Sequence, residues 1–198
     1  MAGPILFTAL VILQALLQPD YSHVKEPISA LAAWAAGWIQ NLNFFVSGAL
    51  MTSFVLGLNL GVRPSPHGTA GFALLLLGSI GIVLSGVFPW RLLNGEPTET
   101  PQHVAAAVMV FALTPLGLIV FSRRMKADPR WQGLAGYTLV TGIVMALLFP
   151  VMGALAIPET GPFHSWVGLL QRAICAVWFT CVLVLATRLR SLASLTHT

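Results

Sequence analysis

The segment Pro162-Phe-His-Ser-Trp-Val-Gly-Leu-Leu-Gln-Arg-Ala173 places a histidine and an arginine at the start of a long apolar run. On a helix of about 3.6 residues per turn, one face carries His164, Gly168, Gln171, Arg172 and Cys175. An arginine about two turns inside a membrane span is costly by a few kcal/mol unless it reaches a polar partner. We therefore expect this face to look into a helical bundle and to mark a polar site.

The composition is typical of a membrane protein with several spans. Hydrophobic residues make up 57% of the 198 residues and charged residues only 8%, and the mean hydropathy is +0.84. Soluble domains have a charged fraction nearer about 25%. Six spans of about 20 residues use most of the chain, so we expect one integral membrane domain over residues 1–198. The net charge of +4 comes from basic residues beside apolar runs, which favours membrane topology over nucleic-acid binding.

We predict an all-α bundle of six transmembrane helices joined by short loops. A polar stretch with two prolines, Pro19 to Pro27, follows the first apolar run. From Pro27 to Gln40 the composition favours a short helix lying at the membrane interface. Pro115 should kink the fourth span. The expected spans cover residues 3–18, 42–62, 70–90, 103–122, 134–157 and 165–188.

The distribution of charge predicts the orientation. Seven of the ten basic residues follow even-numbered spans: Arg63, Arg123, Arg124, Lys126, Arg130, Arg188 and Arg190. The positive-inside rule then places both termini in the cytoplasm and the protein in the cytoplasmic (inner) membrane. The outer side receives five of the six carboxylates and three histidines, namely Asp20, Glu26, Glu96, Glu99 and Glu159 with His23, His103 and His164.

Several short motifs follow one another in order along the chain: Asp20-Tyr-Ser-His-Val-Lys-Glu-Pro-Ile-Ser-Ala-Leu31, Gly37-Trp-Ile-Gln-Asn-Leu-Asn-Phe44 with Gly48, Gly81 to Pro89, His103 with Ala107, and Gly168-Leu-Leu-Gln-Arg172. In this order they make nearly the whole chain resemble a bacterial and archaeal family of membrane proteins, domain of unknown function 998. The resemblance implies a six-helix fold with an outward polar face, and no reaction. Such proteins often carry an aspartate after Phe88-Pro89. This sequence has Trp90-Arg91 there, so any role of that acid carries over only if Glu96 or Glu99 takes its place.

The leading functional hypothesis is a binding protein. We expect an outward-facing polar cavity that takes a lipid headgroup or small amphiphile, built from His23, Glu26, His103, Glu159, His164, Gln171 and Arg172. The expected partners are membrane lipid and other membrane protein subunits, in an accessory role, without nucleic acid. Arg172 has two interpretations: it binds a carboxylate or phosphate of the ligand, or it forms a buried ion pair with Glu26 or Glu159.

Two alternatives stay open at this stage. A metal-dependent hydrolase acting on a lipid at the outer leaflet would use His103 and His164 as zinc ligands together with nearby carboxylates. The absence of an HExxH motif favours the simpler interpretation, in which both histidines begin helices at the membrane interface. A haem held between His103 and His164 is the third hypothesis. The sequence therefore decides neither catalytic activity nor cofactor.

Overall fold

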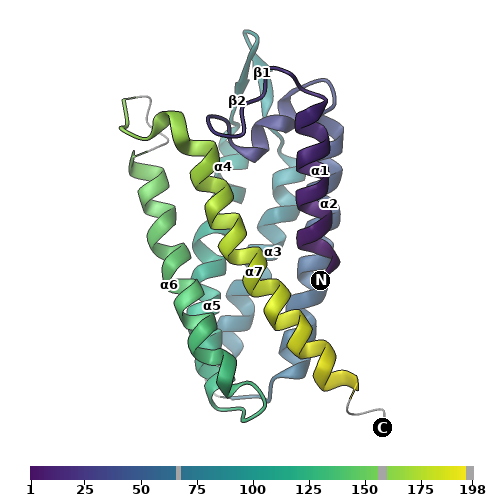
Figure 1. Ribbon diagram of the computed structural model, residues 1–198, viewed down its shortest axis with the longest axis vertical. Coiled ribbons are helices and arrows are strands. Elements are labelled where there is room, and N and C mark those ends of the chain that lie inside the picture. The colour runs from purple at the N-terminus through teal and green to yellow at the C-terminus, as the bar shows by residue number, and fades with distance from the viewer. Residues whose placement is uncertain (66–67, 156–159, 195–198) are drawn as a thin grey trace.

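The computed structural model describes residues 1–65, 68–155 and 160–194, which form a helical bundle with one short β-hairpin (Figure 1). The first half contains α1 (Ala2–Leu16), the 3-10 helix η1 (Ile28–Ala33), α2 (Gly37–Gly61), α3 (Gly68–Val87), β1 (Arg91–Leu93) and β2 (Glu96–Thr98). The second half contains α4 (Pro101–Val108), the π-helix η2 (Met109–Leu113), α5 (Thr114–Lys126), α6 (Gln132–Leu155), the 3-10 helix η3 (His164–Trp166) and α7 (Val167–Ser194). The predicted all-α class is confirmed.

The helices are of the kind that crosses membranes. Within the described residues, 5 helical segments are long and apolar enough to span a bilayer: Gly37–Gly61, Thr69–Val87, Pro101–Lys126, Gln132–Ala154 and His164–Ser194. They correspond to the predicted second to sixth spans. The predicted first span is the apolar helix α1, which has only 15 residues. At about 1.5 Å per residue α1 is shorter than the roughly 30 Å hydrocarbon core of a bilayer.

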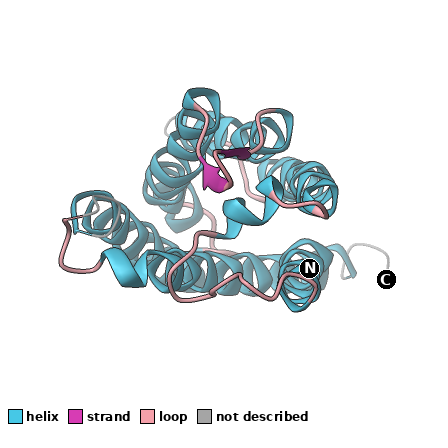
Figure 2. Cartoon of the chain, turned by 90° about the horizontal axis from the view of Figure 1, so that it is seen from above, coloured by secondary structure: helices cyan, strands magenta, loops and turns pink. Residues whose placement is uncertain are grey.

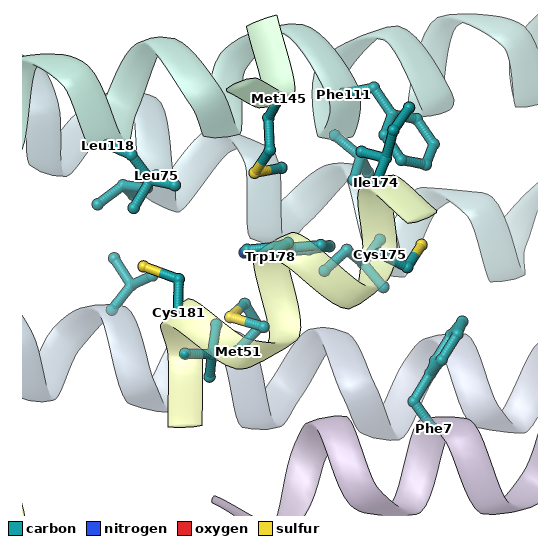
Figure 3. Close-up of a cluster of buried hydrophobic side chains, with 14 of the residues drawn as sticks. Phe7, Met51, Leu75, Phe111, Leu118, Met145, Ile174, Cys175, Trp178 and Cys181 are labelled. Carbon is teal, nitrogen blue, oxygen red and sulfur yellow. The ribbon is translucent and has the colours of Figure 1, made fainter. Parts of the chain in front are cut away.

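Helix α7 crosses the front of the bundle obliquely in Figure 1 and supplies much of its core. Trp178 of α7 lies between Met51 of α2 and Met145 of α6, Cys181 lies further along α7, and all four side chains are buried (Figure 3). Behind α7, small residues let the other helices approach closely. A Cβ atom on Gly81 of α3 would lie 2.9 Å from the carbonyl oxygen of Ala106 in α4. Such close contacts are typical of helix packing in membranes, where small residues lie at the interfaces.

We expected Pro115 to kink this helix, and the irregularity that the structure has directly before it is a π-helical turn. Proline has no amide hydrogen and its ring crowds the carbonyl four residues earlier, which is that of Phe111. The chain absorbs this by forming the π-helical segment Met109–Leu113 directly before Thr114 and Pro115. Pro101 to Lys126 therefore stays one continuous helical segment.

The end of the bundle that carries η1 and the β-hairpin, here called the hairpin end, differs from expectation in two ways. A short helix does follow the first apolar helix, but η1 stops at Ala33 and five of its residues, Ile28 to Ala32, are buried. Seen from above, η1 lies among the larger helices rather than outside them (Figure 2). Gln14 of α1 holds it by donating hydrogen bonds to the carbonyls of Leu31 and Ala36, 2.9 and 3.0 Å away. The predicted surface helix is therefore a buried turn that closes this end.

The second difference is the hairpin, in a stretch that we expected to be a polar loop. Strands β1 and β2 pair antiparallel, with Leu93 opposite Glu96. Asn94 and Gly95 form the turn with φ angles of 54° and 86°. Positive φ at both central residues is the signature of a tight hairpin turn, and Asn-Gly is its most favoured sequence.

Candidate functional site

The first connection of the chain docks against the beginning of α7. The backbone amide of Leu169 donates to the carbonyl of Val24, 3.1 Å away. The backbone amide of Ile28 donates to Oε1 of Gln171 at 2.7 Å, in a buried contact. Gly168 makes this approach possible, since a Cβ atom there would lie only 2.8 Å from the carbonyl oxygen of His23. We call this contact between residues 23–28 and α7 the seam.

Arg172 is part of the seam. Its Nη1 donates to the carbonyls of Glu26 and Gly168 at 3.1 and 2.9 Å, and its Nη2 donates to the hydroxyl of Tyr21. The guanidinium carbon also lies 5.6 Å from the centre of the Tyr21 ring. The carboxylate of Glu26 instead accepts a hydrogen bond from the backbone amide of Ser22, 2.7 Å away. The proposed ion pair between Arg172 and Glu26 is therefore not formed, and Arg172 contacts this residue through its main chain.

On one side of the seam lies a cleft of about 380 Å³, here called the hairpin-end cleft. Its walls come from the seam, the hairpin, α4, α6 and η3. Its apolar wall is formed by Val104, Ala107, Val108, Phe111, Phe149 and Met152. In Figure 1, α6 diverges from α4 toward the hairpin end, which leaves room for the cleft between them.

The rim of the hairpin-end cleft is charged. It is lined by three carboxylates, one lysine and one histidine: Glu26, Glu96, Glu99, Lys25 and His164. Glu99 is exposed to solvent, yet nearby protein atoms partly desolvate it and raise the pKa of its carboxyl group. The rim therefore has more hydrogen-bond acceptors than donors, and an excess of negative charge.

A second hollow lies deeper in the bundle, around His103. This chamber of about 60 Å³ is bordered mainly by apolar and aromatic side chains, with polar groups from Ser29, Ser47, Ser85 and Gln171. His103 is 1% exposed, and its Nδ1 lies 2.8 Å from the carbonyl oxygen of Phe88. Because a carbonyl only accepts, Nδ1 of His103 carries a hydrogen and donates it to Phe88. The chamber has room for a few water molecules.

A third hollow, the α1/α7 groove, lies on the other side of the seam. It has a volume of about 280 Å³ and is lined by His23, Arg172 and the facing surfaces of α1 and α7. His23 is exposed, and its ring lies edge-on to Tyr21 with 5.4 Å between centroids. Partial burial and the nearby charge of Arg172 lower the pKa of His23 below its usual value.

The residues that were predicted to share one cavity thus lie around different hollows. Glu26, His164 and Gln171 line the hairpin-end cleft, while His103 lies in the chamber, which Gln171 also borders. His23 and Arg172 lie in the α1/α7 groove. Glu159 is outside the described residues. Six of the seven predicted residues therefore lie at one end of the bundle, but around three hollows separated by the seam and by Gln171.

The geometry offers little for metal binding. In the part of the chain that the structure describes, no group of three or more His, Cys, Asp or Glu side chains lies in an arrangement that could hold a metal ion. The two proposed ligands, His103 and His164, border different hollows. Neither the zinc hydrolase nor the haem hypothesis gains support from these positions.

The opposite end of the bundle contains a polar cluster that the sequence did not single out. Buried Arg124 donates to Asn59 Oδ1 and to the backbone carbonyls of Asn59, Val62 and Arg63 where α2 ends. Asp128 is fully buried and forms a salt bridge of 2.7 Å with Arg130, the one ion pair among the described residues. These contacts satisfy the carbonyls at the C-terminus of α2, so the cluster is structural.

Comparison with known proteins identifies a family and gives no function. The family described as "Protein of unknown function (DUF998)" matches residues 1–188. No curated protein and no solved structure matches the chain. The functional argument therefore depends on the geometry of the hollows.

Proposed function

The chain belongs to this family of proteins of unknown function, and on that premise we propose that it is a membrane protein whose hairpin-end cleft binds a membrane amphiphile. The headgroup occupies the charged rim, and the first part of the acyl chain lies against the apolar surface of α4 and α6. The proposal includes an accessory role beside other membrane subunits, for which the exposed Leu92 and Leu93 of the hairpin offer an apolar contact surface.

The orientation is part of the proposal. We place the whole chain in the cytoplasmic membrane as one domain, with α1 as the first of six spans and both termini in the cytoplasm. Exposed basic residues at the Asp128 end, among them Arg63, Arg123 and Lys126, support this topology, because such residues are enriched on the cytoplasmic side. The hairpin end then faces outward, and the cleft opens at the level of the outer leaflet.

The observation that carries the proposal is the combination of a charged rim and an apolar interior in one cleft. Ligand sites are typically concave, largely apolar and equipped with a few polar groups that fix orientation. The hairpin-end cleft has this composition, with Glu26, Glu96 and Glu99 above Phe111, Phe149 and Met152. A ligand that matches both parts has a polar head and a hydrocarbon tail.

Access from the bilayer supports an amphiphile over a water-soluble ligand. Val104 and Val108 border the cleft on α4 and are 42% and 46% exposed. On a membrane-spanning helix these apolar side chains face hydrocarbon rather than water. A tail can therefore enter between α4 and the diverging end of α6 while the head stays at the rim.

The rim also favours one class of headgroup. The cleft is lined by three carboxylates and one lysine, so an anionic headgroup at the rim would be repelled by the net negative charge. An amine donates hydrogen bonds to carboxylates and carries a compensating charge. We therefore propose an amphiphile with an amine headgroup as the ligand of the cleft.

The test is native mass spectrometry of delipidated protein in mild detergent after addition of phosphatidylethanolamine or phosphatidylglycerol. Val108→Trp fills the cleft, and Val140→Trp, at a position 58% exposed on α6 and away from the cleft, is the matched control. We expect retained phosphatidylethanolamine in the wild type and in Val140→Trp, and loss of it in Val108→Trp. Equal retention in all three proteins would contradict the proposal.

A further inference from the structure

The α1/α7 groove combines a hydrocarbon wall with a positive charge at one end. Val11 and Ile12 of α1 face Ala176 and Phe179 of α7 across it. Phe7 and Phe179 meet edge-on at 5.4 Å, and Figure 3 shows Phe7 on α1 beside the part of α7 that carries Cys175. From Arg172 to Phe179 the groove follows about two turns of α7, roughly 10 Å of helix.

Among the residues that the structure describes, the charge at the end of the groove has no partner of opposite sign. Among the described residues no carboxylate lies within 4.0 Å of Arg172, since their one salt bridge joins Arg130 and Asp128. The seam supplies neutral acceptors, two carbonyls and one hydroxyl, for three of the five N–H groups of the guanidinium. The Nε–H and one Nη2–H group are not used by described residues. These donors suit two oxygens of one anion.

His23 adds a donor beside Arg172 without adding repulsion. It borders the same groove and lies next to Tyr21, the residue that accepts from Nη2 of Arg172. A ring kept neutral at physiological pH donates one N–H without competing for charge. Thr8 lies on the α1 wall, but its hydroxyl already donates to the carbonyl of Pro4 at 2.8 Å. The polar groups of the groove that can meet a ligand are thus gathered at one end.

We propose that the α1/α7 groove binds one anionic phospholipid, with its phosphate at Arg172 and His23 and an acyl chain along α1 and α7. A guanidinium charge near the hydrocarbon region is costly, and a phosphate neutralises it while accepting its remaining hydrogen bonds. This site is independent of the hairpin-end cleft, because the seam separates the two and the charge of their polar ends has opposite sign.

Native mass spectrometry of delipidated protein titrated with phosphatidylglycerol or zwitterionic phosphatidylcholine tests this proposal. Ala176→Phe fills the groove and leaves Arg172 itself unchanged, and Ala173→Phe, an exposed position one turn away that does not border the groove, is the matched control. Arg172→Gln removes the charge directly. Because Arg172 also anchors the seam, Ala176→Phe keeps the test valid if Arg172→Gln does not fold.

We expect phosphatidylglycerol to bind the wild type and Ala173→Phe with similar affinity. Its affinity for Ala176→Phe and for folded Arg172→Gln should be lower by a factor of about ten or more. Phosphatidylcholine should bind more weakly than phosphatidylglycerol. Val108→Trp, which tests the cleft, should leave phosphatidylglycerol binding unchanged. Unaltered binding in Ala176→Phe would overturn the proposal. Displacement by an equal concentration of glycerol phosphate would also overturn it, since a free anion rather than a lipid would then be the ligand.

Discussion

The side-chain oxygen of Gln171 accepts a hydrogen bond of 2.7 Å from the backbone amide of Ile28, a residue 143 positions earlier. This contact ties the first connection to the last helix. Gln171 also borders both the chamber of His103 and the hairpin-end cleft. The geometry of the hairpin-end cleft therefore depends on the buried hydrogen bond between Ile28 and Gln171.

Replacing Gln171 by leucine removes the acceptor and leaves the buried amide of Ile28 unpaired. We expect the free energy of unfolding to fall by about 1–3 kcal/mol, measured by thermal or denaturant unfolding in detergent. Gln102→Leu, at an exposed position on α4, should change stability little. Equal losses in the two variants would show that the buried hydrogen bond contributes nothing specific.

Gly168→Ala tests how closely the seam is packed. The added methyl group would overlap the main chain of Glu26 and lie 2.8 Å from the carbonyl oxygen of His23, so the connection must move away from α7. We expect lower thermal stability and faster proteolysis of the first connection. Gly136→Ala is the control, because a methyl group there meets nothing within 4 Å and improves helix propensity. A fully stable Gly168→Ala protein would refute the described contact.

Arg124→Leu tests the opposite end of the bundle. The substitution leaves the carbonyls of Asn59, Val62 and Arg63 at the end of α2 without their donor. The unfolding free energy should fall by about 2 kcal/mol or more, measured by chemical denaturation. Exposed Arg123, its neighbour, provides the control: Arg123→Leu should stay within about 0.5 kcal/mol of the wild type.

The stability of the end of the bundle that carries Asp128 should depend on pH in the acid range. Hydrogen bonds from Arg130 hold the pKa of this carboxyl group below its ordinary value of 3.8, against the opposing effect of burial. A carboxyl group whose pKa is lowered by folding contributes stability that is complete above its ordinary pKa and is lost as the pH falls below it. Melting temperatures should therefore be insensitive to this group above about pH 5 and fall below about pH 4. Asp128→Asn should be less stable at neutral pH and should lack that acid-induced loss.

The sequence predicted the helices well because long apolar runs leave few alternatives in a membrane protein. It missed the structure between Pro27 and Gln40. There the composition indicated a surface helix, whereas hydrogen bonds from Gln14 and to Gln171 hold a short turn inside the bundle. Those partners are distant in sequence, so local periodicity could not reveal them. The hairpin, in contrast, was detectable from Asn94-Gly95.

The candidate site was predicted only in part, for a similar reason. Helical periodicity placed Gly168, Gln171 and Arg172 on one face and topology placed the histidines at the same end. Neither could show that the seam would fill the space between them. The apolar wall of the cleft, formed by residues such as Phe149 and Met152 on α6, carries no sequence signal apart from hydrophobicity.

Photo-crosslinking in native membranes tests the central claim most directly. Benzoylphenylalanine at Val108, inside the hairpin-end cleft, is compared with the same residue at Val140 on the surface of α6, and the attached lipids are identified by mass spectrometry. If the cleft binds an amphiphile with an amine headgroup, position 108 will carry that class in excess over its share of the membrane, and position 140 will reflect bulk lipid. The same lipid mixture at both positions would contradict the account.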